Sequence, residues 1–191
     1  MPVAIEVPGL DAFAAEIPDG RVVLLEGDLS PAKGHLARRI ARTAAEAKRP
    51  VTLLTTRGEA CDGVQVREAE EWPSDGHPTD QDLVVDSFSL LALGHAPGQV
   101  ADRLRAIRRS CQKGARIAVL VLDDGLLDPA SRAACHHFAD GVIQFHVRDD
   151  SDGPVTFLRI PKWMDRAGAD KNLFYGFDGR QMLIDTRRRV T

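Results

Sequence analysis

The amino-acid sequence predicts an α/β fold, with a mostly parallel sheet flanked by helices and an antiparallel extension at its C-terminal end. Three observations support this class. Short apolar strands alternate with helical patterns up to Val147, these strands lack the period-two alternation of a half-exposed sheet, and turn signals join the last strands. At 191 residues the chain is expected to form one domain, residues 1–191.

The parallel part of the sheet is predicted to take five strands. Each is a short apolar run, and Gly, Pro or charged residues stand near its ends. Because both faces of each run are apolar, helices should cover the sheet on both sides. The predicted strands are VVLLE (22–26), RPVTLLTT (49–56), LVVD (83–86), RIAVLVL (116–122) and GVIQFHV (141–147).

Helices are predicted between these strands. In the first, Leu36, Ile40 and Ala44 recur at helical spacing, and most of the charged residues fall off this stripe. The third begins with proline, which is favoured in a first helical turn. An acidic stretch containing Pro and Gly, residues 68–82, is predicted to be an exposed connection. The predicted helices are residues 32–48, 99–112 and 129–138.

After residue 147 the pattern changes to strands joined by turns. The turn DDSDG is followed by three strand candidates, which predict an antiparallel edge. These candidates are PVTFLRI (154–160), LFYGF (173–177) and QMLIDT (181–186).

Composition excludes several classes of protein. The net charge of −3 gives no reason to expect nucleic-acid binding, and no apolar run is long enough to span a membrane. Three cysteines without a CxxC pair argue against a disulfide framework and a zinc site. The first residues have no basic segment followed by an apolar core, so we expect no signal peptide and a cytoplasmic protein.

The segment that follows the first predicted core strand has the layout of a phosphate-binding loop. In the pattern GxxxxGK[ST], backbone N–H groups surround phosphates, the lysine reaches the β/γ-phosphates, and the hydroxyl binds Mg²⁺. Lys33 takes the lysine position, but Ala32 replaces the second glycine and Gly34 replaces the hydroxyl residue. Two alternatives remain: a weakened nucleotide or anion site, or an eroded loop that only joins strand to helix. The candidate phosphate-binding residues are Gly27, Asp28, Leu29, Ser30, Ala32, Lys33, Gly34 and His35.

Asp86 is the second candidate site residue. It closes the predicted strand LVVD, and a carboxylate in that position holds Mg²⁺ in P-loop proteins. Because ligands of open parallel sheets bind at the carboxyl ends of strands, Lys33 and Asp86 should lie at one edge. With no hydroxyl at Gly34, Asp86 is expected to be a vestigial metal residue, and Mg²⁺ binding is doubtful.

Taken together, these segments resemble the RecA-like P-loop ATPases, and among them the KaiC group with its archaeal KaiC- and ArlH-type members. The stretch PGLDAFAAEIPDGRVVLLEG is similar to the opening of that family, and VVDSFSLL resembles its Walker B strand. CHHFADGVIQF and VTFLRIPKW are similar to two of its later strands. The resemblance implies a RecA-like fold and assigns Lys162 to a lysine that can reach the nucleotide of a neighbouring subunit in a ring.

The departures from this family concern the hydrolysis step. Active members commonly carry two adjacent glutamates at the end of the second core strand, where this chain has Thr55 and Thr56. Threonine cannot act as a general base at neutral pH, and the next carboxylate is Glu59. The family's inter-subunit arginine falls on Met164.

We therefore expect a degenerate member of the group, a pseudoenzyme that is not an efficient ATPase. Its role would be regulatory or scaffolding, in signalling or motility, with weak binding of ATP, ADP or another anion and with a protein partner or a second copy of the chain. One alternative is an active ring ATPase whose missing groups come from a partner or from Glu59. The other is a protein-interaction module whose pocket is filled by side chains.

Overall fold

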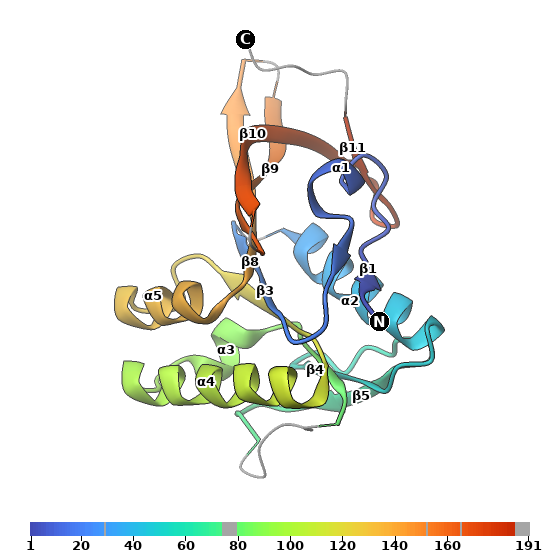
Figure 1. The fold of residues 1–191 in the computed structure, drawn as a ribbon. Helices are drawn as coiled ribbons and strands as arrows, with labels where there is room; N and C mark the ends of the chain where they lie inside the picture. Colours follow the sequence, from blue (N-terminus) through green and yellow to red (C-terminus); the bar gives the residue numbers. More distant parts are fainter. Residues whose placement is uncertain (29, 74–79, 152, 165, 186–191) are drawn as a thin grey trace.

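The computed structural model describes the chain except residues 29, 74–79, 152, 165 and 186–191, and it leaves the side chains of residues 166–171 undescribed. Most of the strands form a single large sheet (Figure 1). They are β3 (Val22–Gly27), β4 (Val51–Thr55), β5 (Gln65–Glu68), β6 (Asp82–Val85), β7 (Ala118–Asp123), β8 (Gly141–Asp150), β9 (Gly153–Trp163), β10 (Arg166–Phe177) and β11 (Met182–Ile184).

The predicted α/β class is confirmed. Within the described residues the strand order is β11-β10-β9-β8-β3-β7-β6-β4-β5. Pairing is parallel from β8 to β5 and antiparallel from β8 to β11. A further small antiparallel sheet joins β1 (Val3–Ala4) to β2 (Glu16–Ile17), and the short helix α1 (Asp11–Ala14) lies between them in sequence.

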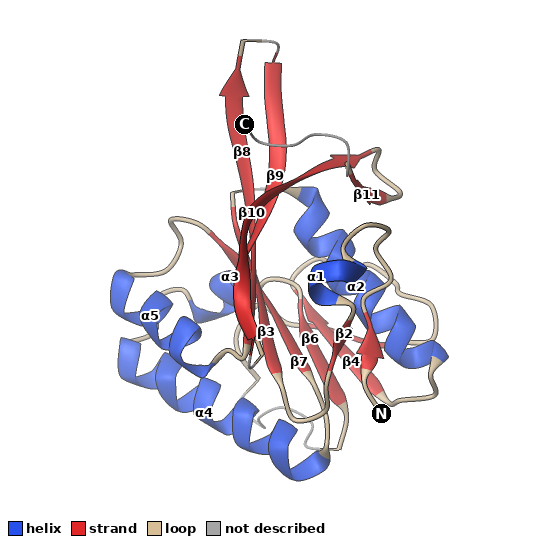
Figure 2. Cartoon of the chain, turned by 45° about the horizontal axis from the view of Figure 1, so that its top comes forward, coloured by secondary structure: helices blue, strands red, loops and turns tan. Residues whose placement is uncertain are grey.

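Helices cover both faces of the parallel strands, as the apolar runs predicted. The first face packs against α1 and α2 through residues such as Leu36 and Ile40. The second face packs against three helices through residues such as Phe88, Leu104 and Cys135. Figures 1 and 2 show these two layers on opposite sides of the sheet. The long helices are α2 (Pro31–Glu46), α4 (Pro97–Gly114) and α5 (Pro129–Phe138), and α3 (Phe88–Ala92) is a single short turn of helix.

Two features of the large sheet bear on function. The end of the β8–β9 hairpin projects beyond the helical layers (Figure 2). The carboxyl ends of β3, β6 and β7 meet at one edge, where the loop after β3 leads into α2. The candidate residues at positions 27–35 and 86 therefore fall at that edge.

Buried ion pairs fix the opposite edge of the parallel strands. Asp82 is fully buried and binds the Arg49 guanidinium in a fork, with Nε–Oδ2 2.5 Å and Nη2–Oδ1 2.7 Å. Asp140 accepts hydrogen bonds from Arg21, Arg108 and the Val22 amide. These pairs tie the amino ends of β3, β6 and β8 to their neighbours.

Candidate functional site

The loop after β3 is short and tightly held. Gly27 closes the strand at φ +124°, and a Cβ there would lie 2.0 Å from the carbonyl oxygen of Phe145, so no other residue fits without rearrangement. Ser30 is the N-cap of α2, and its hydroxyl accepts a hydrogen bond from the Ala32 amide at 3.3 Å. The helix begins at Pro31, so Ala32 has a helical backbone and is not strained.

The backbone donors of this loop point to acceptors within the protein. Asp28 N donates to the Phe145 carbonyl at 3.1 Å, and Lys33 N donates to the Ser30 carbonyl at 3.3 Å. Pro31 has no N–H to offer. The Asp28 carboxylate is itself in the loop and accepts a hydrogen bond from Val147 N at 2.8 Å. Thus the amides of Asp28, Ala32 and Lys33 already donate within the protein, and the Asp28 carboxylate adds a negative charge to the loop.

Lys33 points into the protein and not toward solvent. Its ammonium nitrogen lies 2.5 Å from the Gly27 carbonyl oxygen, 3.0 Å from the Leu122 carbonyl oxygen and 2.7 Å from Asp123 Oδ1. Three acceptors match the three donors of an ammonium group. The side chain is 1% exposed, whereas that of Asp123 is 19% exposed. Lys33 is therefore fully bonded without any ligand.

Asp86 has a comparable partner within the chain. Its Oδ2 lies 2.7 Å from Nη2 of Arg38, and its side chain is buried. Arg38 also forms an ion pair with Glu59, which follows β4. A Cβ at Gly34 would lie 2.9 Å from Asp86 Oδ1, so Asp86 occupies the space that a serine or threonine side chain would need at position 34.

These residues do not fit the Mg²⁺ ion that the P-loop ATPase fold implies. That ion takes a hydroxyl from the loop and a strand carboxylate, together with the phosphates. Here position 34 has no hydroxyl, a Cβ there would require Asp86 to shift, and the carboxylate of Asp86 already faces a guanidinium. Among the residues that the structure describes, no group of three or more His, Cys, Asp or Glu side chains is placed to hold a metal ion.

The residues at the carboxyl end of β4 carry hydroxyl side chains. Thr55 is fully buried, and its hydroxyl accepts a hydrogen bond from Arg57 N at 3.2 Å. The hydroxyls of Thr56 and Ser87 lie 3.1 Å apart. Glu59, the nearest following carboxylate, is held by Arg38.

His35 and Lys162 have contacts within the chain, and Leu29 lies outside the described residues. The His35 ring packs against Phe177 at 5.1 Å between centroids. Its pKa is lowered by burial and then by the neighbouring arginines of α2, which favours the neutral ring at pH 7. Lys162 donates to the carbonyl oxygen of Ala139.

Sequence reasoning missed the partner of Lys33. The segment DDGLLD, residues 123–128, suggests from its sequence a solvated turn in which Asp123 and Asp124 cap the helix that starts near Pro129. The structure assigns that cap to Asp128, whose Oδ1 accepts from Ala130 N and Ser131 N, while Asp123 pairs with Lys33. The pairing of β3 with β7, which the sequence did not predict, brings Asp123 opposite Gly27.

A second polar cluster that sequence reasoning missed centres on Glu26, which is 1% exposed. Its Oε2 lies 2.8 Å from His136 Nε2, and its Oε1 accepts from Gln144 Nε2 at 2.7 Å. Burial raises the pKa of Glu26, but the hydrogen bonds from His136 and Gln144 outweigh it and bring the pKa below its usual value. The glutamate therefore stays ionised inside the sheet.

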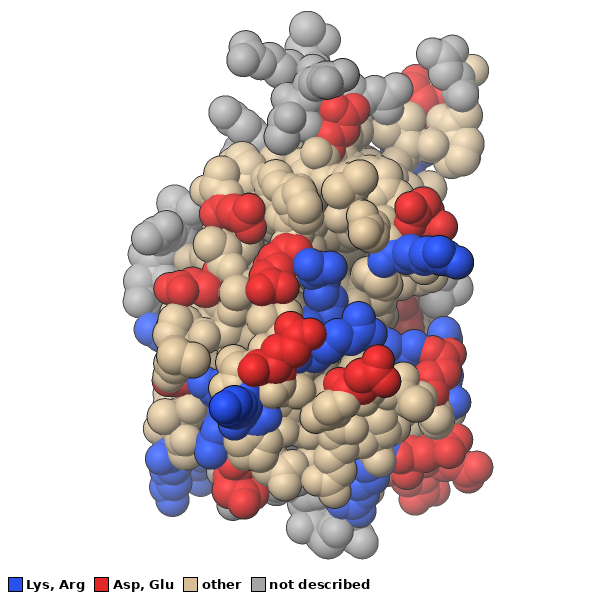
Figure 3. All heavy atoms as spheres, turned by 90° about the vertical axis from the view of Figure 1, so that its right-hand side faces the viewer, with Lys and Arg blue, Asp and Glu red and all other residues tan. Residues whose placement is uncertain are grey.

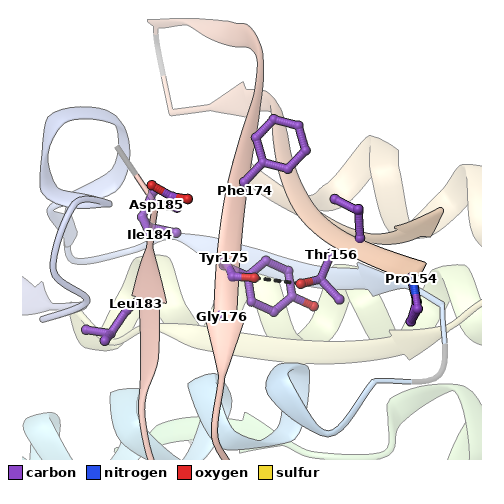
Figure 4. A pocket seen from close by; sticks show the side chains of 9 residues that line it. Pro154, Thr156, Phe174, Tyr175, Gly176, Leu183, Ile184 and Asp185 are labelled. Atoms are coloured by element: carbon purple, nitrogen blue, oxygen red, sulfur yellow. Dashed lines mark hydrogen bonds between the residues drawn. The ribbon is translucent and has the colours of Figure 1, made fainter. Parts of the chain in front are cut away.

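A hollow of about 350 Å³ lies between β9, β10 and β11, away from Lys33. Figure 4 shows the strand residues around it, with the hydrogen bond from Thr156 to the Tyr175 carbonyl. The hollow and the loop are linked through Tyr175, whose hydroxyl lies 3.4 Å from that of Ser30. Its lining residues are Pro154, Val155, Thr156, Phe174, Tyr175, Gly176, Leu183, Ile184 and Asp185.

The surface on the right-hand side of Figure 1 carries both signs of charge. Figure 3 shows Lys and Arg side chains there interleaved with Asp and Glu. Among the ion pairs of the described residues, Arg38 and Arg39 of α2 pair with Glu59 and Glu6. In the described part of the chain, no helix is both long and apolar enough to cross a membrane.

Comparisons with known proteins agree on the fold. Residues 32–191 match the model of a family of unknown function, DUF7125. No curated protein matches the sequence. The fold is similar to that of the KaiC-like protein PH0186 from Pyrococcus horikoshii OT3, with a TM-score of 0.75 and 17% identity over 97% of this chain and 99% of that chain. It is also similar to the flagellar accessory protein FlaH from Methanocaldococcus jannaschii, with a TM-score of 0.74 and 14% identity over 96% and 98%.

Proposed function

The chain belongs to the DUF7125 family, and we propose that it is a non-catalytic regulatory or scaffolding protein with a RecA-like fold. In this proposal its phosphate-binding loop is degenerate and binds ATP or ADP weakly, without turnover. A single observation carries the proposal: Lys33 is buried and bonded to Asp123 and to two backbone carbonyls.

The position of Lys33 works against nucleotide binding. To reach a phosphate, the ammonium group must leave three acceptors inside the protein. Separating a buried pair costs about 3–5 kcal/mol, and partial exposure of Asp123 reduces that to about 2 kcal/mol. Because each 1.4 kcal/mol is about a factor of ten in affinity, this cost alone weakens binding roughly 30-fold. The carboxylates of Asp28 and Asp123 beside the loop add repulsion toward a phosphate.

The absence of turnover follows from the groups that surround the loop. Position 34 offers no hydroxyl for a metal ion, and Thr55 and Thr56 cannot take a proton from water at neutral pH. Each such loss removes several kcal/mol of transition-state stabilisation. The proposal therefore predicts no hydrolysis above the uncatalysed rate.

A regulatory or scaffolding role in signalling or motility is in keeping with the similar structures. FlaH is a flagellar accessory protein and PH0186 is a KaiC-like protein. In this proposal the chain acts through a protein partner or through a second copy of itself. Lys162 donates to the Ala139 carbonyl within the chain. To contact a neighbouring subunit, it would have to give up this hydrogen bond and form one across the interface.

The test is calorimetric titration of the full chain with ATP and with ADP, each with and without Mg²⁺, alongside a phosphate-release assay. We expect dissociation constants weaker than about 100 μM, little dependence on Mg²⁺ and no phosphate release. Lys33→Ala should weaken any binding, while Lys113→Ala, an exposed lysine near the end of α4, should leave it unchanged.

The possible results separate three functions. Micromolar, Mg²⁺-dependent binding with phosphate release would refute the proposal and favour an active ATPase. Weak binding that is lost in Lys33→Ala supports a nucleotide-responsive regulator. If millimolar nucleotide gives no heat, the proposed nucleotide binding is refuted. The function that then remains is a protein-interaction module whose pocket is filled by side chains.

A further inference from the structure

We propose that Arg38 takes the place of the divalent cation at this site. Its guanidinium is a cation fixed to the chain, which neutralises Asp86 and leaves no position for a metal ion. The inference rests on the proposed non-catalytic function, because an ATPase of this fold needs its Mg²⁺. It goes further by naming the group that replaced the ion.

The geometry places the guanidinium against the carboxylate that would bind metal. Arg38 follows Gly34 by four residues on α2, so both lie on the same side of the helix. Nη2 of Arg38 lies 2.7 Å from Asp86 Oδ2, while Oδ1 of Asp86 packs against the bare Cα of Gly34. The first oxygen is bonded to a cation, and the second faces a position without a side chain.

Arg38 also bridges two strand ends, as a bound cation would. Asp86 directly follows β6, and Glu59 lies beyond the end of β4, which is the neighbouring strand. One guanidinium with two carboxylates can satisfy both through its separate donors. Arg38 thereby holds the carboxyl ends of β4 and β6 against α2 without an external ion.

Gly34 and Arg38 depend on each other in this arrangement. A serine at position 34 would place its Cβ within 2.9 Å of Asp86 Oδ1, tighter than a normal contact, and would push the carboxylate off the guanidinium. The missing hydroxyl is therefore required by the ion pair. It follows that restoring serine alone should not restore metal binding as long as Arg38 is present.

The experiment measures Mn²⁺ binding by electron paramagnetic resonance, in the absence of nucleotide. We compare the wild type with Arg38→Gln, with the double variant Arg38→Gln/Asp86→Asn, and with Arg39→Gln as the matched control. Arg39 is the next residue on α2, and its partner Glu6 is 3.6 Å away on the surface. Melting temperatures with and without Mn²⁺ are recorded for all four proteins.

We expect neither the wild type nor Arg39→Gln to bind Mn²⁺ at this site. Arg38→Gln should gain a Mn²⁺ site that the wild type lacks, because a positive charge beside the carboxylate of Asp86 has been removed. Its melting temperature should fall without metal and recover when Mn²⁺ is added. The double variant should lose the gained site.

The inference is overturned if the wild type binds Mn²⁺ as tightly as Arg38→Gln does, or if folded Arg38→Gln gains no site. If Arg38→Gln does not fold, the stability of the double variant Arg38→Gln/Asp86→Asn tests the inference instead. Removing both charges should restore stability relative to Arg38→Gln alone, and no restoration would contradict the proposed neutralisation. Because nucleotide is absent, the Mn²⁺ experiment tests this inference separately from the proposed function. The proposed function is refuted by ATP hydrolysis, which is measured in the other assay.

Discussion

Replacing Lys33 by methionine should destabilise the folded protein. The substitution removes the ammonium group and keeps most of the side-chain volume. It leaves the carboxylate of Asp123 without its cation and the carbonyls of Gly27 and Leu122 without a shared donor. In a P-loop whose lysine serves a ligand, the same change would cost affinity and little stability.

The magnitude follows from burial. Truncating one partner of a buried ion pair typically costs about 3–5 kcal/mol. Lys33 is 1% exposed, but Asp123 is 19% exposed and can be partly rehydrated, so we expect a loss of about 2–3 kcal/mol. For a chain of this length that corresponds to a melting temperature lowered by about 4–12 °C.

Urea denaturation followed by circular dichroism measures this loss. The double variant Lys33→Met/Asp123→Asn should recover part of the stability that Lys33→Met loses. The coupling energy between the two positions should be about 1–2 kcal/mol. Lys113→Met on the exposed surface of α4 should stay within about 0.5 kcal/mol of the wild type. If Lys33→Met also stays within that range, the ion pair does not hold the loop and the argument fails.

Three further changes test other parts of the structure by the same denaturation assay. Gly27→Ala should cost about 3 kcal/mol or more, because φ is +124° and the new Cβ would lie 2.0 Å from the Phe145 carbonyl oxygen; near-normal stability would refute the close approach. Asp82→Ala should cost about 3 kcal/mol, since it removes the buried carboxylate that accepts from Arg49 and from Ile117 N, and a loss below about 1 kcal/mol would contradict this. The pKa of Glu26 is lower in the folded chain than its usual 4.5, so its contribution is present above that pH and is lost as the pH falls through the folded value. Between about pH 5 and 3 the wild type should therefore lose more stability than Glu26→Gln, and equal slopes would contradict the bond to His136.

The strands of the parallel sheet were predictable because burial on both faces leaves a strong sequence signal. The runs around Leu24 and Leu120 are apolar at every position, which a half-exposed strand would not tolerate. Short elements left no such signal. β5 has no apolar run, as suits a strand at the edge of the sheet, and α3 is too short to show helical periodicity.

The sequence also predicted which residues gather at the strand ends, but not what they bind. Lys33 and Asp86 lie at the expected edge. Their partners come from elsewhere: Asp123 is brought beside Gly27 by the register of β3 with β7, and Arg38 reaches Asp86 from the helix. Local patterns carry no information about such long-range pairs. For the same reason the role of Arg38 as a partner of Asp86 could not be predicted from the sequence.

The central place of β3 in the sheet has a consequence for biosynthesis. β3 is made early, yet its two neighbours are β7 and β8, which begin at Ala118 and Gly141. A nascent chain that ends before Ala118 contains β3 and the loop with its lysine, but neither of the strands that flank β3. The apolar strand β3 therefore stays unpaired while the rest of the chain is translated. Since contacts distant in sequence form slowly, we expect the sheet to fold late and cooperatively, only after β7 and β8 have been synthesised, with exposure to chaperones until then.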